Sequence, residues 1–136
     1  LNKENKMKIL LVGEDDEYLE TQKTALKSEE GFSCLSARMY YNFQWKMVEE
    51  HQIDAIVLIE DGVRYGKRFM TDFVQQLRMY DSRVPIIFIL EEPFASTQFE
   101  NFFKGKDVKH FLHKTEEKSN LKDLLIQIKK DGKSKD

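Results

Sequence analysis

Three short apolar segments constrain the fold of this chain more than any other feature of its sequence. They comprise residues 9–12, 55–59 and 85–90, and each is rich in β-branched side chains and contains no charged or polar residue. Strands that are covered on both faces of a parallel sheet have this pattern, whereas half-exposed strands alternate apolar and polar residues. The three segments are therefore expected to be central strands of a parallel sheet.

Two weaker apolar segments complete the predicted sheet. Residues 32–37 follow Gly31, and residues 108–112 follow Gly105, so both segments begin after a turn signal. We expect them to be the flanking strands. A chain of 136 residues buries roughly two thirds of the surface that its unfolded state exposes, which is enough for one core of this kind.

The segments between the predicted strands carry apolar residues at helical spacing. The first has an acidic start and ends before Gly31; its predicted inner stripe is Tyr18, Leu19, Gln22, Ala25 and Leu26. Residues 43–50 and 69–80 repeat the pattern, and the second of these segments places Phe69, Phe73, Leu77 and Tyr80 on one face. Each segment is expected to be a helix.

Two capping signals predict the last two helices. Residues 97–100 have the form of a capping box, and Ser119 is a candidate N-cap for a helix with Leu121, Leu124, Leu125 and Ile128 on its inner face. Strand and helix therefore alternate five times. This order predicts an α/β fold, a flavodoxin-like doubly wound parallel sheet of five strands in the order 2-1-3-4-5 with five helices.

The ends of the chain and its charge limit the classes of function. Residues 1–6 and 131–136 are polar and unpatterned, so they are expected to be tails or linkers around one domain of residues 7–130. No apolar run approaches the roughly 20 residues of a membrane helix. With 22 basic and 24 acidic side chains the net charge is -2, which argues against contact with nucleic acid or an anionic membrane.

Cysteine usage bears on the compartment. Cys34 is the single cysteine of the chain, which excludes an internal disulfide and a cysteine-rich zinc site. A lone thiol is typical of proteins in a reducing compartment. We therefore expect a cytoplasmic protein.

Four consecutive acids follow the first predicted strand. In open α/β sheets ligands bind beyond the carboxyl ends of the strands, and Gly13 there leads into Glu14, Asp15, Asp16 and Glu17. Mg²⁺ prefers carboxylate and water oxygens, so Glu14, Asp15 and Asp16 are candidate ligands. Acids at the start of a helix also interact favourably with its dipole. The residues alone leave both interpretations open.

Several of these features together resemble the receiver domains of bacterial response regulators, the CheY-like superfamily. The resemblance rests on the first strand with its acids, on Asp61 and Glu60 after the third strand, on Val84 and Pro85 before the fourth, and on Lys114 after the fifth. It spans residues 7–130. It implies paired acids that hold Mg²⁺, an aspartate that accepts phosphate, a small hydroxyl residue that contacts the phosphoryl group and a lysine that pairs with it.

The resemblance also shows where this sequence departs from the receiver pattern. The phosphoacceptor position falls on Ile59, Glu60 or Asp61, depending on the alignment, and the hydroxyl position falls on Leu90. Leucine cannot donate a hydrogen bond. Lys114 matches the lysine of the family, and Phe111 matches an aromatic whose rotation reports activation. An atypical receiver without ordinary aspartate phosphorylation is therefore expected.

Such a domain is expected to act through protein contacts rather than by turnover, and to require no cofactor. The partner is either a second copy or another protein, and a sensor histidine kinase is one candidate. The expected contact surface comprises the fourth predicted helix, which opens at residues 97–100, the fifth predicted strand at residues 108–112, and the fifth predicted helix, which Ser119 is expected to cap. Aromatic residues around helix four exceed what one buried stripe needs and are candidate interface anchors: Phe94, Phe99, Phe102 and Phe103.

Two alternatives remain. One is a working phosphoacceptor that uses Asp61 or Glu60, with Mg²⁺ held by Asp15 and Asp16 and charge neutralised by Lys114. The other is a small flavodoxin-like enzyme or nucleotide-binding domain, which the absence of a glycine-rich first loop disfavours. The three histidines are dispersed along the sequence, which argues against a histidine metal site.

Overall fold

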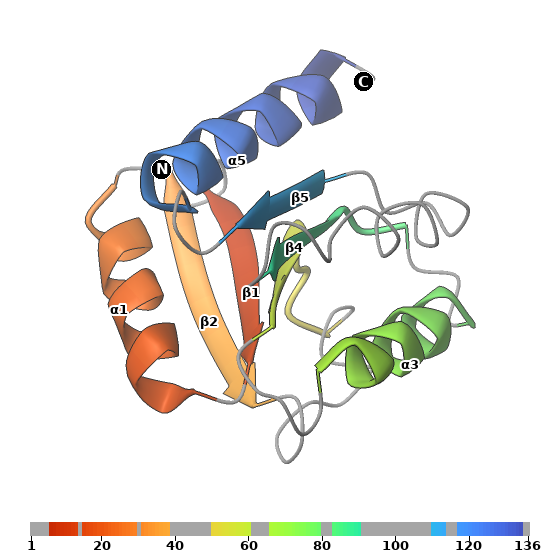
Figure 1. Cartoon of the computed structure of the whole chain (residues 1–136). Coiled ribbons are helices and arrows are strands. Elements are labelled where there is room, and N and C mark those ends of the chain that lie inside the picture. Colours follow the sequence, from red (N-terminus) through yellow and green to blue (C-terminus); the bar gives the residue numbers. More distant parts are fainter. Residues whose placement is uncertain are drawn as a thin grey trace.

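The structure is a computed structural model, and it describes residues 6–13, 15–29, 31–38, 50–60, 66–79, 83–90, 110–113 and 117–134 (Figure 1). The predicted helix at 43–50 lies outside these ranges except for its last residue, Glu50. The predicted helix that opens at 97–100 lies outside them entirely.

The described strands form one parallel sheet. They are β1 (Met7–Gly13), β2 (Phe32–Arg38), β3 (Ala55–Ile59), β4 (Ile86–Leu90) and β5 (His110–His113). Their order is β2-β1-β3-β4-β5, and each neighbouring pair is parallel. The predicted sheet and strand order are therefore confirmed.

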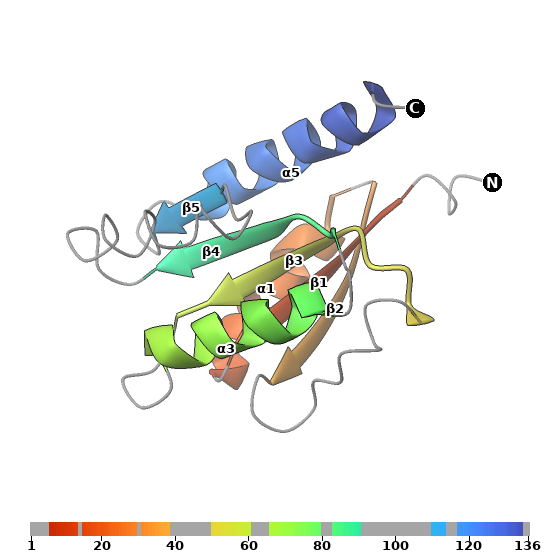
Figure 2. The same cartoon turned by 90° about the vertical axis from the view of Figure 1, so that its right-hand side faces the viewer.

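Three helices are described, and they cover both faces of the sheet. They are α1 (Asp16–Lys27), α3 (Gly66–Met79) and α5 (Glu117–Ser134). Figures 1 and 2 show α1 and α5 on one face and α3 on the other. None of the helices among the described residues is long and apolar enough to cross a membrane.

Alternation along the strands divides the core into two layers. On the α3 side, Leu58 and Phe88 pack with Phe73 and Leu77 of α3. On the other side, residues such as Val57 pack with the inner stripes of α1 and α5. All five residues of β3 and of β4 are buried, as expected for central strands that carry helices on both faces.

Some boundaries and side-chain positions differ from the sequence predictions. Ala25 is exposed, whereas Leu19, Gln22 and Leu26 of α1 are buried and Tyr18 is partly buried against the same layer. The fifth helix begins at Glu117, so Ser119 lies inside it and is not its N-cap. The same helix continues past Lys130 to Ser134, where the sequence predicted a tail. A hydrogen bond of 3.0 Å from the amide of Gln127 to the carboxylate of Asp131 supports this last stretch.

Candidate functional site

The carboxyl ends of β3, β4 and β5 bring three sequence-distant residues to one edge of the sheet. The backbone N–H of Glu60 donates to the carbonyl of Ile89 at 2.8 Å, and Ile59 pairs with Ile89. Glu60 therefore lies beside Leu90, the next residue of β4. Leu90 in turn pairs with His113 of β5. The result is a row of Glu60, Leu90 and His113 across three strands.

The structure distinguishes two of the candidate acceptor positions by the direction of their side chains. Ile59 is buried in the layer that packs against α1 and α5. Glu60 follows it at the end of the strand and is only 7% exposed. Of these two residues, Glu60 supplies a carboxylate beside β4. Asp61 lies outside the described residues.

Leu90 is the chemical departure at this edge. Its side chain is 0% exposed and belongs to the apolar layer on the α3 side of the sheet. A buried hydrocarbon offers neither a donor nor an acceptor to an anion. The structure therefore places an apolar group next to Glu60, where the receiver resemblance implies a hydroxyl.

His113 was not among the residues that the sequence predicted for this site. It stands at the end of the row, and its Nδ1 atom is buried and has no hydrogen-bond partner among the described residues. Spacing along one strand could not show that His113 pairs with Leu90, because that pairing depends on the register between β4 and β5.

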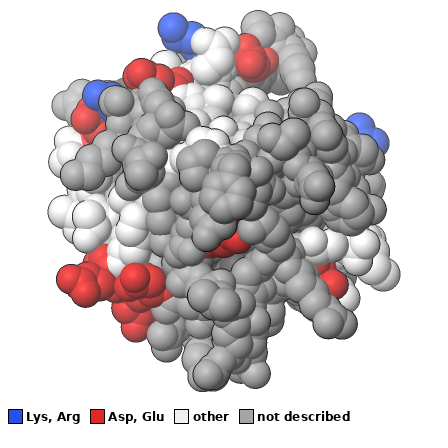
Figure 3. All heavy atoms as spheres, in the orientation of Figure 1, with Lys and Arg blue, Asp and Glu red and all other residues white. Residues whose placement is uncertain are grey.

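The acids after β1 lie at the start of α1. Asp15 is the N-cap: one of its carboxylate oxygens accepts from the backbone N–H of Glu17 at 3.1 Å and of Tyr18 at 3.2 Å. Asp16 and Glu17 occupy the first turn. Figure 3 shows carboxylates gathered on the surface at this end of α1. Asp15 thus has a structural role in starting the helix.

The fit of a magnesium ion was tested against the same acids. Within the described ranges, no group of three or more histidine, cysteine, aspartate or glutamate side chains converges to hold a metal. Asp15 already accepts two backbone hydrogen bonds, and Glu14 lies outside the description. Mg²⁺ needs only one or two carboxylates together with water, so its binding by Asp15 and Asp16 stays a prediction.

The remaining predicted site residues fall into two groups. Phe111 is half-buried and packs edge-to-face on Phe88, with ring centroids 5.5 Å apart and planes at 88°. This contact holds the predicted switch aromatic against the α3-side core. The others lie outside the described residues: Glu14, Asp61, Phe94, Phe99, Phe102, Phe103 and Lys114.

Asp15 allows the capping and metal roles to be separated. Asp15→Ala is expected to lower the free energy of unfolding by about 1 kcal/mol, because the first turn of α1 loses its acceptor. Asp15→Asn is expected to change it by only a few tenths of a kcal/mol, since asparagine caps about as well as aspartate. Urea unfolding with and without MgCl₂ measures both effects. If Mg²⁺ stabilises the parent chain and Asp15→Asn abolishes that gain, Asp15 is a metal ligand.

Comparison with known proteins gives a result at the level of structure alone. No protein-family model matches the sequence, and no curated protein matches it either. Among solved structures, a chemotaxis protein of Vibrio cholerae is similar with a TM-score of 0.72 and 16% identity, over 90% of this chain and 98% of that one. A response regulator receiver domain from Clostridium thermocellum is similar with a TM-score of 0.76 and 13% identity, over 93% of this chain and 97% of that one.

A third similar structure is the receiver domain of a Francisella response regulator. Its TM-score is 0.69 at 18% identity, over 93% of this chain and 98% of that one. Sequence identity at this level carries no residue roles across, whereas each of the three alignments covers at least 90% of both chains. The chain therefore has the CheY-like fold of response-regulator receiver domains.

Proposed function

We propose that this chain is an atypical receiver domain that regulates through protein contacts and is not switched by aspartate phosphorylation. The observation that carries the proposal is the fully buried Leu90 beside Glu60 at the carboxyl edge of the sheet. The receiver fold accounts for the regulatory class. The altered edge accounts for the departure from ordinary phosphotransfer.

Phosphoryl transfer depends on groups that stabilise the charge spread over the transferred oxygens. Leu90 contributes none, and its neighbours in the α3-side layer are apolar. Glu60 places a carboxylate one methylene farther from the backbone than an aspartate would, so its geometry differs from that of an aspartyl acceptor. Its charge imitates a permanently modified state. Under this proposal no metal or other cofactor is required.

The proposed contact surface comprises the segment of helix four, β5 and α5. The aromatic residues Phe94, Phe99, Phe102 and Phe103 concentrate near the first of these elements in the sequence, and aromatic anchors supply much of the energy of compact interfaces. The partner is a second copy or another protein, and a sensor histidine kinase is one candidate. The proposed compartment is the cytoplasm.

The test is exposure of the isolated domain to acetyl phosphate and Mg²⁺. We expect the intact mass to stay unchanged, because Leu90 offers no hydroxyl donor to a phosphoryl group. Sedimentation of the same samples across micromolar concentrations should give the same association state with and without the phosphodonor. The two readouts together test an interaction module that works without phosphate.

A stoichiometric gain of one phosphoryl group would contradict the proposal. Asp61→Asn and Glu60→Gln then identify the acceptor, since only the variant of the true acceptor loses the modification. That outcome would establish the working receiver with Asp15, Asp16 and Lys114 as the candidate supporting residues.

A further inference from the structure

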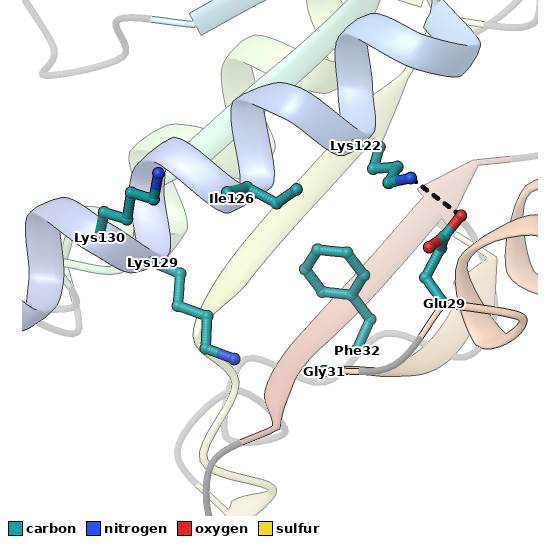
Figure 4. A pocket seen from close by; sticks show the side chains of 7 residues that line it. All are labelled: Glu29, Gly31, Phe32, Lys122, Ile126, Lys129 and Lys130. Carbon is teal, nitrogen blue, oxygen red and sulfur yellow. Dashed lines mark ion pairs between the residues drawn. The ribbon is translucent and has the colours of Figure 1, made fainter.

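A cleft of about 280 Å³ lies between α5 and the turn that leads into β2 (Figure 4). Gly31 and Phe32 form its β2 side. The carbonyl of Gly31 accepts from the backbone N–H of Met7, the first residue of β1, at 2.8 Å. The cleft is therefore at the amino-terminal edge of the sheet, opposite the row of Glu60, Leu90 and His113.

The interior of the cleft is apolar. Phe32 is 6% exposed and belongs to the core layer beneath α1 and α5, and Ile126 of α5 packs against the same layer. In Figure 4 the Phe32 ring and the Ile126 side chain lie between the α5 ribbon and the start of β2. A hydrocarbon or aromatic group placed there would have the face that contacts Phe32 and Ile126 shielded from water.

The rim of the cleft is cationic. Lys122, Lys129 and Lys130 line it, and Glu29 is the single carboxylate among its lining residues. Glu29 is already engaged, with its Oε1 atom 3.1 Å from the Nζ atom of Lys122. The lining therefore has two more positive than negative charges, and the structure shows no ion pair of Lys129 with another described residue.

Gly31 lies beside one of these ammonium groups. Its φ is +97°, a conformation that glycine adopts readily and other residues rarely do. A Cβ atom at this position would lie 3.5 Å from the Nζ atom of Lys129. Figure 4 shows Lys129 extending toward Gly31, whereas Lys130 extends away from it.

We infer that this cleft binds a small carboxylate with an apolar body, of the size of an arylalkanoic acid. The apolar part occupies the space over Phe32 and Ile126, and the carboxylate pairs with Lys129. The volume is just below the range of roughly 300 to 1,000 Å³ for small-molecule sites, so the ligand is small. The inference does not depend on the proposed function, because the two sites occupy opposite edges of the sheet.

The probe is 3-phenylpropanoate, titrated into the ¹⁵N-labelled full chain while the amide resonances of Gly31 and Phe32 are followed. The matched ligand is 3-phenylpropanamide, which has the same shape without the charge. We expect saturable shifts with the acid and binding that is about threefold or more weaker with the amide, the size of effect that one exposed ion pair gives.

Two charge-removing variants locate the contact. Lys129→Gln is expected to weaken binding of the acid about threefold, and Lys129→Arg should retain it. Lys27→Gln removes an equal charge from the exposed end of α1, outside the cleft lining, and should bind like the parent chain. Thermal unfolding of each variant checks the fold.

Three outcomes would overturn the inference. They are no saturable shift at Gly31 and Phe32, equal binding of acid and amide, and equal losses in Lys129→Gln and Lys27→Gln. The last result would mean that net charge alone attracts the ligand. None of these outcomes affects the phosphorylation test, which reports on the other edge.

Discussion

Phe88→Ala is expected to lower the free energy of unfolding by about 3 to 5 kcal/mol, the range for truncating a fully buried aromatic side chain. Phe88 is 0% exposed at the centre of β4 and packs in the layer beneath α3. Its neighbours belong to several strands and to α3, so they cannot collapse freely into the space left behind. Urea unfolding of the parent chain and the variant measures the loss.

Phe111→Ala is the matched comparison, because it removes the other ring of the same edge-to-face pair. Its effect should be smaller, since Phe111 is only half-buried. The double variant should show a coupling of about 0.5 to 1.5 kcal/mol between the two rings. A loss below about 1 kcal/mol in Phe88→Ala would contradict the described packing of β4.

Raising the pH through the alkaline range is expected to destabilise the chain through Cys34. Burial raises the pKa of its thiol from 9.0 to about 11, and the nearby Lys23 and Lys27 offset only part of this shift. The unfolded chain therefore loses the thiol proton at a lower pH than the folded chain does. The stabilisation is fully present below pH 9.0 and is lost as the pH rises to about 11. Its size is about 2 to 3 kcal/mol.

The control for this effect is Cys34→Ala, because other groups also titrate at alkaline pH. Unfolding free energies of both chains are compared from about pH 8 to about pH 11. Relative to Cys34→Ala, the parent chain should lose about 2 to 3 kcal/mol of unfolding free energy over this pH range, because only the parent chain carries the thiol. Curves that stay parallel over this range would show that the thiol ionises equally easily in the folded and unfolded chains.

The position of Glu60 shows why the sequence left part of the site undetermined. Alignment to the receiver pattern allowed Ile59, Glu60 or Asp61 at the end of the third strand. A shift of one residue turns a side chain to the opposite face of a sheet. An alignment error of one residue therefore changes which functional group is assigned to the site. The hydrogen bond from Glu60 to Ile89 and the burial of Ile59 beneath α1 and α5 distinguish these two residues.

Asp15 illustrates a second limit. The same acidic run predicted either metal ligands or favourable charges at a helix start, because carboxylates serve both purposes. Which purpose applies depends on where the backbone N–H groups of Glu17 and Tyr18 point, and the structure directs both of them at Asp15. The end of the last helix was also undetermined by the sequence: residues 131–136 were predicted to be a tail, but α5 continues to Ser134.

The sequence by itself determined the three central strands, because short, uniformly apolar segments rich in β-branched residues are typical of strands covered on both faces. It also determined the chemistry of Leu90, which has no hydroxyl in any fold. The tertiary structure decided which residues meet. The row of Glu60, Leu90 and His113 follows from the register of parallel strands, and the cleft joins Gly31 with Lys129. Contacts across such long stretches of chain arise from packing, which local sequence patterns do not encode.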